Sequence, residues 1–321
     1  MPLTDLTLDE LRTFRPDVAE PDDFDAFWRR TLDEARAQAA PPTLDAADSP
    51  ITQLVIEDLA FSGFGGEPIR AWVTRPRTTD RLPTVIEYIG YNGGRGIPGE
   101  RLQWAAAGYV HILMDTRGQG SGWGTGGDTP DPHGSEGSVP GFMTRGIGAP
   151  DTYYYRRLFT DAVRLVDVAA DLPFVDPAHI SVTGGSQGGG ITLAAAGLHE
   201  AVSAAMPDVP FLCHFRRSVE LTPGHPFREI EQYLAVRRDQ VERVFQTLSY
   251  FDGVNFARRI HAPALFSVGL MDGTVLPSSV FAAYNHCGSD DKAIEVYAFN
   301  GHEGGQLEQW RRQTQWLTAR L

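Results

Sequence analysis

The clearest chemical signal in the sequence is a glycine-rich turn with a serine at its centre. Residues 180–183 alternate between apolar and polar side chains, as a short strand does, and the alanine- and leucine-rich run 191–198 favours a helix. Between them, Gly184, Ser186 and Gly188 have the spacing G-x-S-x-G. A strand, a tight turn and a helix form the context of a nucleophile elbow. The pattern therefore predicts Ser186 as a nucleophile, with an ordinary strand-to-helix turn as the alternative.

A base has to accompany this serine, because a neutral hydroxyl is a weak nucleophile. In hydrolases with such an elbow, the acid and then the histidine follow the serine along the chain. His302 lies in the glycine-rich segment 300–305, directly after the last strand pattern, so its imidazole is predicted to reach the sheet edge. His214, His261 and His286 lie in or beside helical patterns and are interpreted as structural or surface residues.

The acid that orients the histidine is expected at the end of an earlier strand. Asp272 follows the apolar strand pattern 264–268 and a short loop, which makes it the preferred candidate. Its role would be to hold the imidazole tautomer and to stabilise the imidazolium. Asp208, after Met206 and Pro207, is the rival, and Asp252 is weaker because it belongs to a helical region.

Two backbone amides are predicted to form an oxyanion hole. One is the amide of Gln187, the residue after the nucleophile, and the fold class supplies the second from a loop after an earlier strand. Here that loop is the glycine-rich segment 90–94, and the amide of Tyr91 is the candidate. A plain glycine turn is the alternative for this segment.

Strand and helix patterns alternate along most of the chain. The strand patterns are 54–61, 69–74, 83–89, 110–114, 180–183, 204–206, 264–268 and 294–298, and the helical stretches between them are 99–107, 154–171, 190–198 and 278–284. Such alternation predicts an α/β protein with a doubly wound, mostly parallel sheet, and the first two strands form a hairpin. Chemistry in such sheets gathers beyond the carboxyl ends of the strands.

The chain is predicted to form a single domain spanning residues 1–321. Two regions of it depart from the alternation of strands and helices. An N-terminal extension, about 1–50, wraps the surface at 1–20, carries a core-facing helix from residue 21 or 22, and ends in a linker at 38–50. A helical insertion, about 212–261, precedes the acid and is interpreted as a lid, a subunit contact or extra cover for the core.

Composition excludes several classes of function. The chain of 321 residues has a formal net charge of -13, which argues against a nucleic-acid partner, since binding to phosphates needs clustered Lys and Arg. No apolar run approaches the roughly 20 residues that span a bilayer. The first ten residues do not look like a signal peptide, so we expect a cytoplasmic protein with no membrane partner.

The long loop 118–141 contains Asp128, Asp131 and His133. A loop of this length suggests a function. Turn formation explains the two aspartates better than metal binding does, so neither a metal nor another cofactor is expected.

Five segments together resemble one family. They are Gly-Tyr-Asn-Gly at 90–93, Asp-Thr-Arg-Gly-Gln-Gly at 115–120, Gly-Gly-Ser-Gln-Gly-Gly at 184–189, the run 248–257 and Gly-His-Glu at 301–303. The sequence resembles the acetyl xylan esterases and cephalosporin C deacetylases, a carbohydrate esterase family of the α/β-hydrolase fold. The resemblance extends from about Phe24 to the C-terminal helix.

The resemblance implies Ser186 as nucleophile, Asp272 as orienting acid and His302 as base. It implies the amides of Tyr91 and Gln187 as the oxyanion hole, with Tyr91 also lining the acetyl pocket. The segment 117–119 is structural support in this family.

The same resemblance implies a serine esterase that acts through an acetyl-enzyme intermediate. Its substrates would be acetylated xylo-oligosaccharides and related small acetate esters, including cephalosporin C. Members are typically intracellular homohexamers whose active sites face an inner cavity.

Two departures from the family pattern flank the expected site. Ile89 stands where a histidine usually precedes the Gly-Tyr-Asn-Gly loop, and Val275-Leu276-Pro277 stands where the family has Cys-Pro-Pro. They put the acyl and alcohol preference in doubt. Another small-ester hydrolase or a peptidase of the same fold, and a non-catalytic binding scaffold, are the alternative functions.

Overall fold

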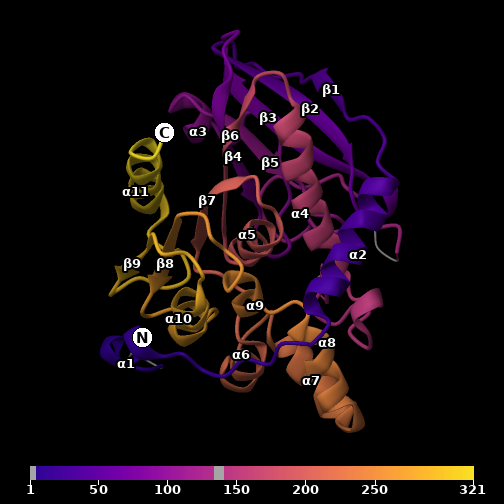
Figure 1. Ribbon diagram of the computed structural model, residues 1–321, viewed down its shortest axis with the longest axis vertical. Helices are drawn as coiled ribbons and strands as arrows, with labels where there is room; N and C mark the ends of the chain where they lie inside the picture. The colour runs from indigo at the N-terminus through magenta and orange to yellow at the C-terminus, as the bar shows by residue number, and fades with distance from the viewer. Residues whose placement is uncertain (1–4, 134–140) are drawn as a thin grey trace.

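The computed structural model describes residues 5–133 and 141–321 (Figure 1). Across these residues, nine strands form one sheet in the order β1-β2-β3-β5-β4-β6-β7-β8-β9. The strands are β1 (Thr43–Ala46), β2 (Leu54–Ser62), β3 (Pro68–Pro76), β4 (Leu82–Tyr88), β5 (Val110–Met114), β6 (Val175–Gly185), β7 (Val202–Asp208), β8 (Ala264–Gly269) and β9 (Lys292–Tyr297).

The sheet has an antiparallel part and a parallel part. Strands β1, β2, β3 and β5 pair antiparallel in that order, and β2 and β3 form the predicted hairpin. Every neighbour pair from β5–β4 to β8–β9 is parallel. The predicted doubly wound, mostly parallel sheet is confirmed, and the carboxyl ends of β6, β7 and β8 meet at one edge.

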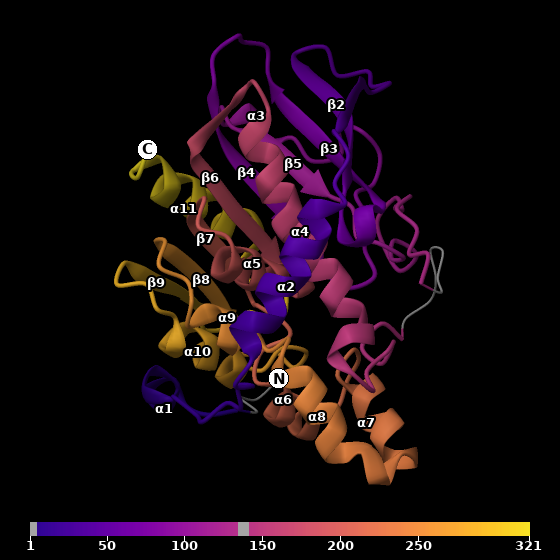
Figure 2. The ribbon, with the colours of Figure 1, turned by 45° about the vertical axis from the view of Figure 1, so that its right-hand side comes forward.

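Helices cover both faces of this sheet. The α-helices, not all of which contact the sheet, are α1 (Leu8–Thr13), α2 (Phe24–Ala37), α3 (Gln103–Ala106), α4 (Tyr154–Asp171), α5 (Gln187–Leu198), α6 (Phe215–Leu221), α7 (Arg228–Val236), α8 (Val241–Ser249), α9 (Gly253–Ala257), α10 (Pro277–His286) and α11 (Gln306–Thr318). Figure 2 shows α4 crossing one face of the sheet, with α2 lying outside it. None of the helices in the described chain has both the length and the apolar character needed to cross a membrane.

The period of two along each strand decides which face a side chain covers. On β4, Val85 packs in a cluster with Trp104 of α3 and Leu317 of α11, whereas the next residue, Ile86, belongs to the large core under α4 and α5. Both faces are therefore apolar, which explains why the central strands appear in the sequence as continuous apolar runs.

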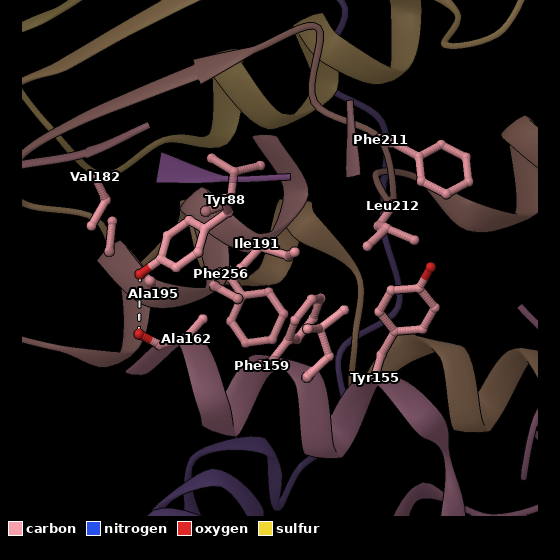
Figure 3. Packing of buried hydrophobic residues seen from close by; sticks show 14 of the residues in the cluster. Tyr88, Tyr155, Phe159, Ala162, Val182, Ile191, Ala195, Phe211, Leu212 and Phe256 are labelled. Atoms are coloured by element: carbon pink, nitrogen blue, oxygen red, sulfur yellow. Dashed lines mark hydrogen bonds between the residues drawn. The ribbon is translucent and has the colours of Figure 1, made fainter. Parts of the chain in front are cut away.

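Aromatic residues fill the core between the sheet and the outer helices (Figure 3). Phe159 of α4 is fully buried, and its ring lies 5.4 Å from that of Phe256 and 6.1 Å from that of Trp28. The Tyr88 hydroxyl donates a hydrogen bond of 3.0 Å to the carbonyl of Ala162, which ties the end of β4 to α4. This packing fixes the strand end that supports the serine turn.

Two N-terminal elements were not predicted. Residues 38–50, predicted as a linker, contain β1, an edge strand with mostly exposed residues and no alternating apolar pattern. Within residues 5–20, predicted to wrap the surface, α1 begins with a capping box in which Thr7 and Glu10 bond each other's backbone amides. The Thr-Leu-Asp-Glu signal for that helix was present in the sequence.

The predicted helical insertion contains α6, α7, α8 and α9. Helices α7 and α8 project from one end of the molecule (Figures 1 and 2). The last of them, α9, packs against α5, the helix that follows the serine turn. The insertion is therefore joined to the elements around Ser186.

Replacing Phe159 with alanine tests the core that supports the site. We expect Phe159→Ala to lower the free energy of unfolding by about 3–5 kcal/mol, because the cavity left between the sheet and α2 cannot close fully. Urea unfolding followed by circular dichroism measures this loss. Val236→Ala is the control, since that side chain is 74% exposed and its loss should change stability by less than about 0.5 kcal/mol. Equal effects of the two substitutions would contradict the prediction.

Candidate active site

Ser186 occupies the sharp turn between β6 and α5. Its backbone has φ 58° and ψ -119°, a conformation that residues with a side chain rarely adopt. The turn is possible only because its neighbours lack side chains: a Cβ on Gly188 would lie 2.2 Å from the carbonyl oxygen of Tyr88. The structure thus has the strand, strained turn and helix of a nucleophile elbow.

The structure brings Ser186, His302 and Asp272 together at the carboxyl edge of the sheet. Nε2 of His302 lies 2.9 Å from Oγ of Ser186, and Nδ1 of His302 lies 2.8 Å from Oδ2 of Asp272. Because a carboxylate accepts hydrogen bonds, Nδ1 carries the proton and the neutral imidazole presents Nε2 as an acceptor to the serine hydroxyl. This arrangement suits removal of the hydroxyl proton by the imidazole.

The carboxylate of Asp272 is itself held in place. Its side chain is 1% exposed, and Oδ1 accepts hydrogen bonds from the backbone amides of Thr274 (2.8 Å) and Val275 (2.9 Å). The loop carrying the acid is joined to the loop carrying the histidine, because the amide of Met271 donates to the carbonyl of Asn300 at 3.0 Å. The position of the imidazole thus depends on two loops that fix one another.

The rival acid, Asp208, has a different set of partners. Its carboxylate accepts hydrogen bonds from the side-chain amides of Gln309 (2.9 Å) and Gln313 (2.8 Å), both on α11. Burial raises the pKa of Asp208 to about 7. Asp208 therefore ties the last helix to the end of β7 rather than orienting His302.

Asp252, the weaker acid candidate, and His286, one of the histidines interpreted as structural, have partners outside the site. Asp252 caps α9, accepting from the amides of Val254, His214 and Phe215, and burial raises its pKa to about 6. Nδ1 of His286 bonds the carbonyl of Ala282 one turn earlier in its helix.

The two amides predicted to bind an oxyanion lie on the loops beside Ser186. Gln187 is the first residue of α5, so its backbone N–H has no acceptor within the helix. Its side chain is buried and fixed, with Oε1 accepting from the hydroxyl of Tyr155 and from Nε2 of Gln119, each at 3.0 Å. Within the described chain, the backbone N–H of Tyr91 has no hydrogen-bond acceptor either. Both amides are thus free to bind a ligand.

Three side chains anchor the Tyr91 segment, and sequence reasoning singled out only one of them. The carbonyl of Tyr91 accepts from Nε1 of Trp123 at 2.8 Å, and the next amide, that of Asn92, donates to Oε1 of Gln119. The phenol donates to Oε1 of Glu229 at 2.6 Å. Gln119 falls in the segment assigned as structural support, whereas Trp123 and Glu229 carried no signal, because neither has a recognisable motif around it.

A cavity of about 1080 Å³ opens over these residues. Its lining joins Ser186 and His302 to aromatic and other apolar side chains from several loops and helices. The lining includes Tyr91, Trp104, Trp123, His225, Pro226, Leu307 and Trp310. His225 and Pro226 precede α7, so the helical insertion reaches the cavity. The space is enough for a small organic ester with one or more rings.

The acidic residues of the long loop serve in ion pairs. Asp128 bonds Arg95 at 2.9 Å, Asp131 bonds Arg157 at 2.6 Å, and Nε2 of His133 lies 2.8 Å from Glu67. Over residues 5–133 and 141–321, no cluster of three or more His, Cys, Asp or Glu side chains could hold a metal ion. Residues 134–140 of the predicted loop lie outside the described chain.

Comparison with known proteins identifies the family of this chain. A family model for acetyl xylan esterases matches residues 1–320. The chain belongs to the acetyl xylan esterase family, a family of carboxylic ester hydrolases. An acetyl xylan esterase from Paenibacillus sp. R4 has 38% identity and a TM-score of 0.91, with 98% of this chain and 99% of that chain covered. Acetyl xylan esterase 1 from Thermoanaerobacterium sp. has 34% identity and a TM-score of 0.88 over the same shares.

A curated relative extends beyond this chain. The acetyl esterase Axe7A of Xylanibacter ruminicola is 27% identical over 290 residues, which cover 84% of this chain and 61% of that protein. This chain therefore spans less than two thirds of the length of that relative. The fold predicted from the family resemblance is confirmed: the two solved acetyl xylan esterases share the α/β-hydrolase architecture over nearly their whole length.

The two departures from the acetyl xylan esterase pattern are buried next to the site. Ile89 is 1% exposed, and its carbonyl accepts from Nε2 of Gln187 at 3.2 Å. Val275 is fully buried, and its amide bonds Asp272, while Leu276 is 4% exposed. These side chains lie in the packing behind the loops of the site.

Asp208 should make stability depend on pH. The folded protein holds the pKa of this carboxyl at about 7, against about 3.9 for an unfolded chain. Between these values the folded state binds more protons, so this group's contribution to the free energy of unfolding falls as pH rises from about 4 to about 7. We expect Asp208→Asn to flatten the profile across that window, as measured by urea unfolding at about pH 5 and about pH 8. An unchanged difference between the two pH values in the variant would contradict this assignment.

Proposed function

We propose that this protein is a serine esterase that removes acetyl groups from acetylated xylo-oligosaccharides and related small acetate esters, including cephalosporin C. The proposal rests above all on one observation: hydrogen bonds connect Asp272, His302 and Ser186, beside two backbone amides that have no acceptor among the described residues. Membership of the acetyl xylan esterase family supports the acetyl ester as the bond that is cleaved.

In the first half of the reaction, Oγ of Ser186 attacks the acetyl carbonyl carbon as Nε2 of His302 takes the hydroxyl proton. Negative charge develops on the carbonyl oxygen, where the amides of Tyr91 and Gln187 donate hydrogen bonds to it. The carboxylate of Asp272 stabilises the imidazolium without taking its proton. His302 then gives that proton to the sugar oxygen, the ester bond breaks, and the deacetylated alcohol leaves.

In the second half, water replaces the alcohol. His302 removes a proton from the water, which attacks the acetyl-enzyme carbonyl, and the same two amides stabilise the second oxyanion. The proton returns to Ser186 as the acyl bond breaks, and acetate is released. The chain's own residues carry every proton transfer in this scheme.

Family resemblance supports two further proposals, a homohexameric assembly and a cytoplasmic location. Composition and the pattern of elements support a single domain with no nucleic-acid or membrane partner. A hexamer narrows the approach to each cavity and favours short acetylated sugars over polymeric xylan. Sedimentation equilibrium of the purified chain tests the assembly, and a monomer would overturn it.

Ser186→Ala removes the proposed nucleophile. We expect kcat on an aryl acetate to fall by about 10⁴-fold or more, with the fold unchanged, because no other group can form the acetyl-enzyme. Ser249→Ala, at the end of α8, is the matched control and should retain full turnover. A single organophosphate adduct on Ser186, found by mass spectrometry, would show the same nucleophile directly. Full turnover by Ser186→Ala would refute the site.

The length of the acyl group tests the proposed acetyl pocket. The Tyr91 ring packs edge to face against Phe142 (5.4 Å) and Phe211 (6.4 Å), both buried, so it has no room to turn aside for a longer chain. We expect kcat/KM to fall by at least roughly tenfold from aryl acetate to aryl butyrate. A panel of acetylated xylo-oligosaccharides, cephalosporin C and glucose pentaacetate then ranks the alcohols. A preference for butyrate would exclude the small pocket.

A further inference from the structure

We propose that Glu229, on α7 of the helical insertion, is a positioning residue that aims the Tyr91 amide at the oxyanion by holding the Tyr91 phenol. The inference rests on the ester hydrolysis of the proposed function, but not on the preference for sugars. It gives the insertion a part in the reaction: α7 sets the geometry of a loop that precedes it by 138 residues.

The hydrogen bonds around the Tyr91 phenol fix the direction of its proton. Its oxygen accepts from the backbone amides of Gly141 (3.2 Å) and Phe142 (3.0 Å), which occupies both lone pairs. Its single proton therefore goes to Oε1 of Glu229, at 2.6 Å. The other carboxylate oxygen, Oε2, accepts from the amide of Met143 at 3.1 Å.

Burying the carboxylate of Glu229 beside the Tyr91 phenol costs free energy. Glu229 is buried, with 8% of the residue exposed, and its carboxylate accepts from the Tyr91 phenol and the Met143 amide, with the Gly141 amide also facing it. Burial raises the pKa of Glu229, and burial together with the nearby carboxylate raises the pKa of Tyr91. These donors offset the cost of burying a carboxylate only in part. The pair is better explained by the position it imposes on Tyr91 than by a gain in stability.

The three anchors of Tyr91 act on different parts of the residue. Trp123 holds its carbonyl and Gln119 holds the following amide, so both act on the backbone. Glu229, together with the amides of Gly141 and Phe142, fixes the far end of the side chain, which limits rotation of the whole residue about the loop. Loss of the Glu229 bond lets the backbone at Tyr91 tilt within the limits set by its packed ring, so the N–H points less well at the oxyanion while the N–H itself remains.

Glutamine at position 229 is the discriminating substitution. It keeps the size of glutamate but replaces one acceptor oxygen with an NH₂ donor. In one amide orientation the NH₂ faces the Met143 amide, and in the other it faces a phenol whose lone pairs are already occupied. In the first orientation the side chain at 229 still accepts from the phenol but loses its own anchor at Met143, and in the second the phenol loses its acceptor, so the clamp is weakened without a cavity being created.

We expect Glu229→Gln to lower kcat on aryl acetate by roughly ten- to hundredfold with KM changed less than about twofold. Complete loss of an oxyanion donor costs about 10²–10³-fold in kcat, and misplacing one costs part of that. Glu231→Gln, on the exposed side of the same helix, is the matched control and should behave as the unaltered protein. Thermal unfolding by circular dichroism monitors the fold of both. An unchanged kcat in folded Glu229→Gln overturns the inference.

A double-mutant cycle with Tyr91→Phe tests whether Glu229 acts through the phenol. Tyr91→Phe removes the hydroxyl but keeps the ring and the backbone amide, so its kcat should fall as in Glu229→Gln. In the Tyr91→Phe background, Glu229→Gln should cost little more, because the bond that it weakens is already gone. Additive losses overturn the inference, as does full kcat in Tyr91→Phe, which decides the matter even if Glu229→Gln does not fold.

The same assay separates this inference from the proposed function. If the unaltered protein has no Ser186-dependent turnover of aryl acetate, the proposed function fails. If it has that turnover and both Glu229→Gln and Tyr91→Phe retain it, only the role of Glu229 fails.

Discussion

The hydrogen bond between the hydroxyl of Ser186 and Nε2 of His302 joins two loops that lie 116 residues apart in the chain. A bond of 2.9 Å tolerates little displacement of either loop, so much of the structure serves to hold those two ends still. On one side the strained backbone of Ser186 is enclosed by β6, α5 and the carbonyl of Tyr88. On the other side, the carboxylate of Asp272 accepts a hydrogen bond from the imidazole of His302 and is itself fixed by two backbone amides.

Buried polar contacts extend this fixation around the cavity. The amide side chains of Gln119 and Gln187 bond each other in both directions, which links the loop after β5 to the start of α5. Gln119 also receives the amide of Asn92, so one side chain touches the loops that carry both amides of the proposed oxyanion hole. Fully paired polar groups of this kind specify a single arrangement, whereas an unpaired one would cost free energy in the core.

The helical insertion also contributes to the cavity. It extends away from the sheet, yet it lines the cavity with His225 and Pro226 and reaches the phenol of Tyr91 through Glu229. On two other loops, buried Ile89 and Val275 stand where the family usually has other residues, and the contacts of Gln187 and Asp272 are kept. Differences in substrate preference within the acetyl xylan esterase fold are thus expected to arise from the insertion and these flanking positions rather than from the hydrogen-bonded trio.

Much of the architecture followed from local patterns in the sequence. Apolar runs bounded by glycine and proline marked the central strands, because both faces of a parallel sheet are buried. The G-x-S-x-G spacing marked the turn at Ser186, because only glycine allows strand and helix to approach so closely there. The edge strand β1 escaped prediction because its exposed side chains leave no alternating pattern. The order serine, acid, histidine selected Asp272 and His302 for the site, and their catalytic role remains a prediction.

Tertiary structure alone decided which groups meet. Asp208 and Asp272 both follow strands, and only the three-dimensional path of the loops brings Asp272 to the imidazole and turns Asp208 toward α11. Glu229 and Trp123 have no recognisable motif around them, since their significance lies in contacts with Tyr91 across long stretches of chain. The sequence by itself determined the elements and the chemistry of single residues, because these depend on near neighbours in the chain. The partners of each residue depended on how the sheet and its loops pack, and no local pattern records that.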